Sequence, residues 1–109
     1  MNRVYLIGRA VRDLELQHFG EENKSYVNFT LAVDEYNSKT KESTANFINI
    51  VAFDKKAELL AKYIAKGNQL SVEGKLRTSA YTDQNNKKKY STAVILENFK
   101  FLEKKSDAI

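Results

Sequence analysis

The chain has 109 residues, a length that suits a single domain, and it contains no cysteine, which excludes disulfide bridges and thiolate metal sites. Eighteen Lys and Arg residues against 14 Asp and Glu residues give a net charge of +4, which mildly favours polyanionic partners. No apolar run is long enough for a secretion signal or a membrane span, so we expect a cytoplasmic location and no membrane partner.

Three segments in the first half of the chain have the composition of β-strands. Residues 2–9 are apolar and β-branched, and the segment 10–24 that follows them is polar and rich in turn residues. In residues 26–34 apolar and polar side chains alternate, which predicts a strand with one buried face. A polar, flexible connection over 35–45 leads to a third strand over 46–53.

The third strand, "NFINIVAF", carries apolar side chains on both sides. Ile48, Ile50 and Ala52 point one way, which suits a core. The other side mixes the rings of Phe47 and Phe53 with an amide. Two explanations are possible for these rings: they pack beneath a helix, or they form an exposed binding surface.

The hydrophobic period changes after the third strand. Apolar residues recur at helical spacing over 55–66, and Gly67 is suited to close that helix. Alternation returns over 69–78, where Gly74 suggests a bend or a bulge. A polar hairpin tip then precedes a last strand over 89–102.

The order of these elements predicts the fold class. Five strands with one helix between the third and the fourth is the order of the OB-fold, an all-β five-stranded barrel. A barrel removes exposed strand edges, and the helix can plug one of its ends. A two-sheet sandwich is the alternative, although five strands are few for it. We expect one OB-fold domain over 1–103 and a short polar tail over 104–109.

Catalysis has little support in this sequence. The only histidine, His18, lies in a polar loop, and no second histidine or cysteine exists to share a metal ion with it. The acidic pairs in the chain are better explained as solvated surface. We therefore expect no catalytic residue, no metal site and no cofactor.

Binding is better supported, because four aromatic residues lie where a core does not need them. Phe47 and Phe53 share a strand face about 20 Å apart, from roughly 3.3 Å per residue. Tyr36 lies in the polar connection, and Tyr81 lies where the 69–78 strand enters its hairpin tip. Stacking rings interleaved with cations are typical of single-stranded nucleic-acid binding. The neighbouring cations are Lys39, Lys55, Lys56, Lys75, Arg77, Lys87, Lys88 and Lys89.

Several of these residues also have ordinary structural explanations. The run from Lys87 to Lys89 is as compatible with a solvated hairpin tip as with phosphate contacts. For Tyr5 and Tyr90 the sequence does not decide between a structural role and a binding role. The aromatic residues that we expect in the core or at subunit contacts are Phe29, Tyr63, Phe99 and Phe101.

Longer stretches of the chain resemble one family. "NRVYLIGRAVRD", "FTLAVDEY", "NFINIVAFDKKAELLAKYIAKGNQLSVEGKLRTSAYTD" and "KKYSTAVILENFKFLE" are similar, in this order, to bacterial-type single-stranded DNA-binding proteins. The similarity covers residues 2–103. It implies an OB-fold that wraps single-stranded DNA, in a homotetramer built as a dimer of dimers.

The resemblance also implies roles for individual residues. The family's base-stacking aromatics correspond to Tyr36, Phe47, Phe53 and Tyr81. Its matched cations are Arg3, Lys55 and Arg77.

The implied function is sequence-tolerant coating of single-stranded DNA in the nucleoid during replication, recombination or repair. The alternative is a related OB-fold adaptor, primosomal or RNA-binding. Typical cellular members carry a long linker and an acidic tip, whereas this sequence stops at "EKKSDAI". The resemblance therefore implies either a natural short member of the family or a truncated chain, and in both cases tail-dependent protein partners are not expected.

Overall fold

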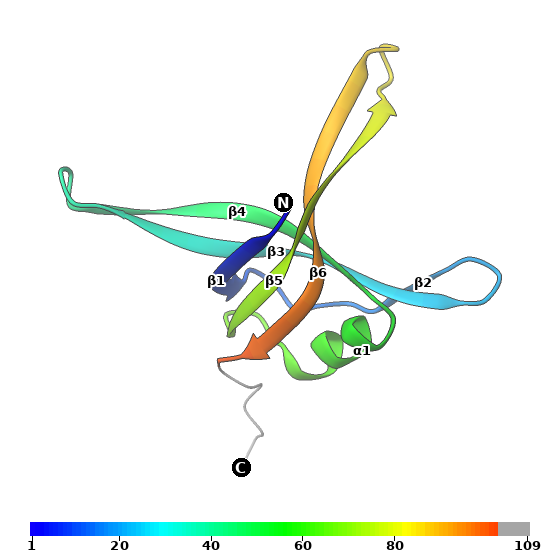
Figure 1. Cartoon of the computed structure of the whole chain (residues 1–109), viewed down its shortest axis with the longest axis horizontal. Helices are drawn as coiled ribbons and strands as arrows, with labels where there is room; N and C mark the ends of the chain where they lie inside the picture. The colour runs from blue at the N-terminus through cyan, green and yellow to red at the C-terminus, as the bar shows by residue number, and fades with distance from the viewer. Residues whose placement is uncertain (103–109) are drawn as a thin grey trace.

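The computed structural model describes residues 1–102, so the expected tail over 104–109 lies outside the described residues. Within them it contains six strands and one helix (Figure 1). The elements are β1 (Val4–Ala10), β2 (Gln17–Phe19), β3 (Lys24–Asn37), β4 (Glu42–Phe53), α1 (Asp54–Tyr63), β5 (Gln69–Thr82) and β6 (Lys88–Phe101).

Five of the strands form a closed barrel. They pair in the order β1-β5-β6-β4-β3, and β1 pairs with β3 at Arg9–Ala32 to complete the ring. The pairs are antiparallel except β4–β6, which is parallel at Ile50–Val94. The predicted five-stranded OB-fold barrel with one helix between its third and fourth strands is confirmed. The short β2 was not predicted, and it extends the sheet beyond β3.

The helix closes the barrel where β4 ends. α1 contacts β3 and β4, and the predicted apolar stripe is buried through Ala57, Leu60 and Ile64. The helix stops at Tyr63 rather than at residue 66, because Ile64 already has extended backbone angles. Gly67 then turns the chain with φ of +87°, and its N–H donates to the Ala10 carbonyl at 2.8 Å. The turn is thus tied to the end of β1.

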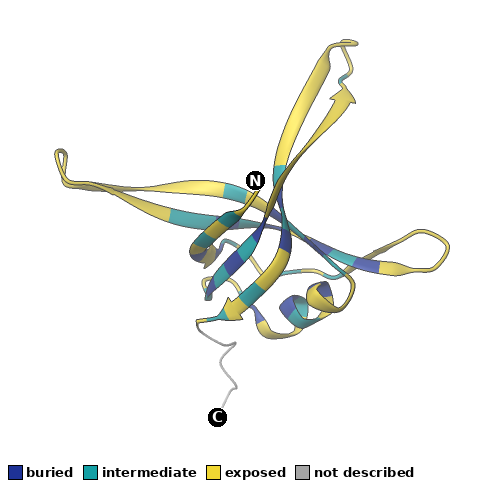
Figure 2. Cartoon of the chain, viewed as in Figure 1, coloured by how far each residue is buried: buried dark blue, intermediate teal, exposed yellow. Residues whose placement is uncertain are grey.

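The core lies inside the barrel, where alternate residues of each strand meet. The alternation predicted for β3 is confirmed by buried Val27, Phe29 and Leu31. Ile50 and Ala52 of β4 are fully buried, as expected for that side of the strand. Figure 2 shows the buried residues gathered on the central body, while the ends of the long strands are exposed.

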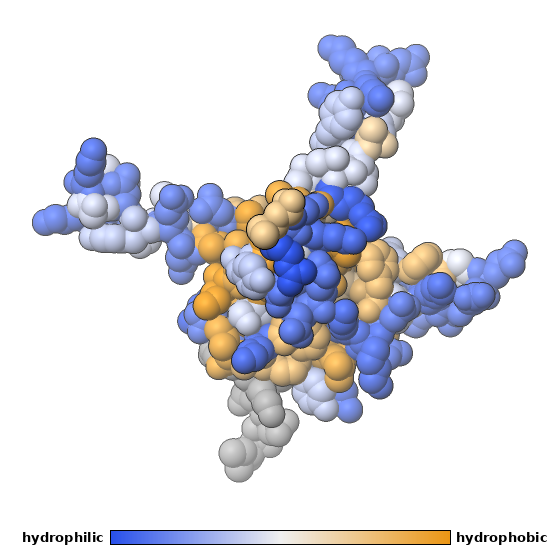
Figure 3. All heavy atoms as spheres, in the orientation of Figure 1, coloured by the Kyte–Doolittle hydropathy of each residue, from blue (hydrophilic) through white to orange (hydrophobic). Residues whose placement is uncertain are grey.

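Three hairpin arms extend from this body, because the strands continue beyond the barrel (Figure 1). These strands are longer than the sequence predicted. The arms are β2–β3, β3–β4 and β5–β6, and their tips are hydrophilic (Figure 3). Their outer parts are exposed on both faces, so no hydrophobic alternation marked them as strands in the sequence. Asn37 closes one turn by accepting from the Lys39 and Thr40 N–H groups, and Asp83 closes another by accepting from Asn85 and Lys87.

The predicted irregularity at Gly74 is confirmed. The β5–β6 register shifts between Glu73 and Gly74, as a β-bulge requires. A Cβ atom on Gly74 would lie 2.2 Å from the Ile95 carbonyl oxygen. The close approach of the two backbones therefore requires glycine at this position.

Candidate nucleic-acid interface

Strand register places three of the predicted aromatics on one face of the β3–β4 ladder. Residues that oppose each other across an antiparallel pair share a face, as do alternate residues of one strand. The opposed pairs are Tyr36–Ser43, Ala32–Phe47 and Tyr26–Phe53. Tyr36, Phe47 and Phe53 therefore lie on the face opposite the buried Ile50 side chain.

The fourth aromatic reaches the same face from another arm. Val51 of β4 pairs with Ile95 of β6, so Ile95 lies on the same face as Phe53. Alternate residues of β6 from Ile95 to Lys89 share that face, and Tyr81 of β5 shares it because it pairs with Lys89. We call the surface that bears Tyr36, Phe47, Phe53 and Tyr81 the aromatic face.

A groove lies on the aromatic face between the β3–β4 ladder and the β5–β6 ladder. Its apolar surface comes partly from Val51 and Ile95, and side-chain amides and hydroxyls provide hydrogen-bonding groups. Such a lining offers both apolar contact and polar partners to a flat heterocycle. Among its residues are Asn28, Asn49, Phe53, Arg77, Ser79 and Ser91.

The rings on this face differ in exposure. Phe47 is 67% exposed, and Tyr36 and Tyr81 are also exposed. Phe53 is half-buried and lies between the groove and a smaller hollow that Lys55 and Lys56 line. Neither phenylalanine belongs to the core cluster, so packing beneath the helix does not explain them.

Most of the predicted cations border the aromatic face. Lys75 and Arg77 share it on β5, and Lys89 shares it on β6. Lys55 and Lys56 lie in the first turn of α1 and line a hollow together with Phe53, and Lys39 lines another hollow together with Tyr36. Six of the predicted cations thus lie on the aromatic face or line a hollow together with one of its rings.

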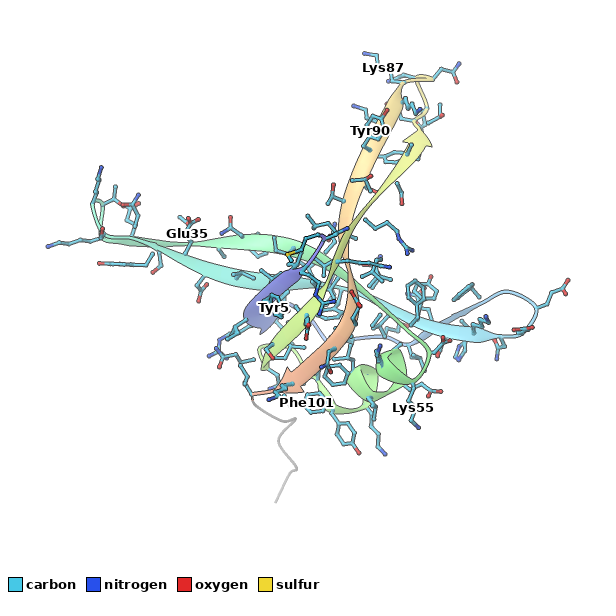
Figure 4. The ribbon with its side chains drawn as sticks, in the orientation of Figure 1. Tyr5, Glu35, Lys55, Lys87, Tyr90 and Phe101 are labelled. Carbon is cyan, nitrogen blue, oxygen red and sulfur yellow. The ribbon has the colours of Figure 1, made fainter. Side chains whose placement is uncertain are left out.

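Three predicted cations are placed differently. Lys87 lies in the β5–β6 turn (Figure 4). Lys88 lies on the opposite face of that arm, with its Nζ atom 5.7 Å from the centre of the Tyr90 ring. Arg3 forms an ion pair with Glu73, and its Nη1 atom lies 3.6 Å from Glu97 Oε2.

The guanidinium of Arg3 is engaged by its neighbours. Its contact with the Tyr5 side chain, followed by the Glu73 charge, raises the pKa of Arg3. Arg3 thus lies in a cluster with Tyr5 of β1 and the two carboxylates Glu73 and Glu97, with which a phosphate would have to compete.

The other aromatics divide into two groups. Phe29 is buried, and Phe99 and Phe101 pack against the core cluster, as expected. Tyr63, expected in the core or at a subunit contact, is exposed rather than buried in the core, and its ring centre lies 5.7 Å from that of Phe101 in an edge contact. Tyr5 and Tyr90, which the sequence left undecided, are both exposed, and Figure 4 shows Tyr90 on the β5–β6 arm.

Sequence reasoning missed two aromatics of this surface, Phe19 and Tyr26. Tyr26 opposes Phe53 directly, and the Phe19 ring contacts both of them. The alternation of β3 already placed Tyr26 opposite the core. Phe19, like Tyr36, lies in a polar segment, where an aromatic has no core to enter.

Other kinds of site are not supported within residues 1–102. This part of the chain holds no group of three or more His, Cys, Asp or Glu side chains that could bind a metal ion. Its helix is too short and too polar to cross a membrane.

The closed barrel and its helix define an OB-fold protein. A model of the single-strand binding protein family matches residues 1–102. The chain is 42% identical over 103 residues to a single-stranded DNA-binding protein of Clostridium perfringens, covering 94% of this chain and 67% of the relative. It is 39% identical over 107 residues to one of Streptococcus pneumoniae, covering 97% and 68%.

A solved structure, the Plasmodium falciparum SSB in complex with ssDNA, has a TM-score of 0.83 to this chain. It is 27% identical to this chain, and the match covers 94% of this chain and 96% of that one. The chain belongs to the single-strand binding protein family.

Proposed function

We propose that this protein binds single-stranded DNA without strong sequence preference, through the aromatic face. The observation that carries the proposal is the strand register, which gathers Tyr36, Phe47, Phe53 and Tyr81 on one surface bordered by lysine and arginine. The relatives named single-stranded DNA-binding proteins and the solved SSB–ssDNA complex support it.

The chemistry of this face favours unpaired strands. Every base has a flat π-surface, so ring stacking tolerates any sequence, and cations bind the phosphates between the stacked bases. In a duplex those base surfaces are already stacked on one another. Coating of exposed strands in replication, recombination or repair would follow, with binding rather than catalysis as the activity.

We expect tight, salt-dependent binding of oligo-dT. The slope of log K against log salt concentration should be near −0.7 for each phosphate that a cation neutralises. Fluorescence anisotropy of labelled oligo-dT at several salt concentrations measures this slope. Duplex DNA and oligo-rU of equal length serve as competitors.

The competitors separate the candidate functions. Preference for dT over both competitors supports the proposal, whereas preference for rU would favour an RNA-binding adaptor. Absence of binding to any of these oligomers at low salt would refute nucleic-acid binding altogether.

A homo-oligomer, with a homotetramer as the expected form, is the second part of the proposal. Tyr5 is 68% exposed and Ile7 is 56% exposed on β1, next to a concavity that Val72 and Phe99 also line. Among residues 1–102, the edge of β1 away from β5 has strand partners only at Arg9 and Ala10. A second copy would cover both the apolar side chains and the open edge.

Ile7→Glu is expected to shift the protein to a smaller species in sedimentation velocity, because a carboxylate would be placed in the interface. Thr44→Glu is the control, because Thr44 lies on the distant β3–β4 arm, and it should sediment like the wild type. Ser71 is not used as the control site because it lines the same concavity as Ile7. A wild type that sediments as a monomer at every concentration would contradict this part of the proposal.

A further inference from the structure

The aromatic face does not end at Phe53. β3 runs through two arms, pairing with β4 over Tyr26–Asn37 and with β2 over Lys24–Tyr26 (Figure 1). Gln17 and Phe53 both oppose Tyr26, one on each side of it, and Phe19 opposes Lys24. By the same alternation rule, Phe19, Tyr26 and Phe53 all share the aromatic face.

These three rings form one cluster. The Phe19 ring centre lies 5.5 Å from that of Tyr26 and 6.3 Å from that of Phe53, with interplanar angles of 71° and 69°. The Tyr26 hydroxyl donates to Gln17 Oε1 at 2.9 Å, which ties the cluster to β2. Rings crossed at these angles meet edge to face, so each contact covers one face of one ring at most, and Phe19 remains 45% exposed.

The cluster is not explained by packing of the core. β2 is exposed at all three of its residues, and Phe19 itself is 45% exposed. None of the three rings belongs to the core cluster or to the apolar residues packed against it. Leu14 and Leu16, which precede β2, do pack there, so the contribution of this segment to the core ends before Phe19.

We propose that Phe19 is an additional base-stacking position, which extends the nucleic-acid path past Phe53 onto the β2–β3 arm. Tyr26 and Phe53 hold its ring, and Lys24, opposite Phe19, supplies a cation near the path. The Nζ atom of Lys24 lies 3.8 Å from Glu22 Oε2. Because this ion pair is exposed, a phosphate can compete with Glu22 for the lysine. This proposal rests on single-stranded DNA as the ligand of the aromatic face.

Three replacements at Phe19 separate stacking from packing. Phe19→Leu keeps apolar bulk but has no flat ring, and Phe19→Ala removes both. Each is expected to weaken binding of oligo-dT by about 5- to 150-fold, the range for one base–aromatic stack. Phe19→Trp is expected to bind as tightly as the wild type. Thermal unfolding of each variant checks that the barrel is intact.

Direct contact can also be measured, because the chain contains no tryptophan. In Phe19→Trp the new indole is the sole tryptophan, and stacking of a base on it should quench its emission when oligo-dT is added. Tyr90→Trp, on the opposite face of the β5–β6 arm, is the matched control and should not be quenched. Phe47→Trp reports on the aromatic face itself.

The outcomes distinguish this inference from the function on which it rests. Quenching of Phe19→Trp together with weaker binding by Phe19→Leu supports it. If oligo-dT quenches Phe47→Trp but not Phe19→Trp, and Phe19→Leu binds like the wild type, the extended path is wrong while the proposed function stands. If none of the proteins binds oligo-dT, both fail.

Discussion

Replacing Phe47 and Phe53 together with alanine is expected to weaken the binding of oligo-dT by about 30-fold to more than 1,000-fold. Each base–aromatic stack contributes roughly 1–3 kcal/mol, and the two rings lie far enough apart for their losses to add. The residues lie on the outer side of β4 and outside the core cluster, so the barrel should stay folded. Anisotropy titration at constant salt measures the change.

The salt dependence provides an internal control for this double variant. The alanines remove rings but no charges, so the slope of log K against log salt should stay close to that of the wild type. A double variant that binds as tightly as the wild type would show that the bases do not stack on β4.

Ile50→Ala is expected to lower the free energy of unfolding by about 2–5 kcal/mol, the usual cost of truncating a buried Ile, Leu or Met. Ile50 is fully buried and opposes both Phe29 on β3 and Val94 on β6, so the cavity would open where three strands meet. That loss is a large part of the roughly 5–15 kcal/mol that stabilises a typical domain. Urea denaturation at fixed protein concentration measures it.

The neighbouring residue gives the matched control. Asn49→Ala changes the adjacent, exposed side chain on the aromatic face and should alter the free energy of unfolding by no more than about 0.5 kcal/mol. Folded Ile50→Ala should keep the wild-type affinity for oligo-dT, because Ile50 points into the barrel. Equal stability of the two variants would contradict the assignment of the two faces of β4.

The sequence predicted the barrel because the buried halves of the strands alternate in hydrophobicity. Val27, Phe29 and Leu31 marked one face of β3, and the helical spacing of Ala57, Leu60 and Ile64 marked α1. Wherever one side of an element packs on the core, the pattern shows in the composition.

The arms could not be predicted in the same way. Residues 35–37 and 42–45 extend β3 and β4, yet both faces are exposed there, and ladder hydrogen bonds leave no periodic trace in side-chain type. For this reason Tyr36 was expected in a loop, whereas it lies on a strand whose register fixes the face it occupies.

The candidate site was predictable in its residues but not in its extent. Phe47 and Phe53 were identified because rings on a half-polar strand face have no core to enter. Phe19 required knowledge that a short strand forms in a polar segment and that it pairs with β3 beside Tyr26. Lys88 and Lys89 are adjacent in sequence, and only the pairing of β6 with β5 shows which of them shares the face of Tyr81.

The central claim is that one face of this sheet binds the DNA, and parallel titrations of Phe47→Ala and Tyr90→Ala test it most directly. Both wild-type residues are 67% exposed, so the variants lose rings of equal accessibility, but only Phe47 lies on the aromatic face. We expect Phe47→Ala to bind oligo-dT about 5- to 150-fold more weakly than the wild type and Tyr90→Ala to bind it equally well. Equal losses in the two variants, or a loss confined to Tyr90→Ala, would contradict the claim.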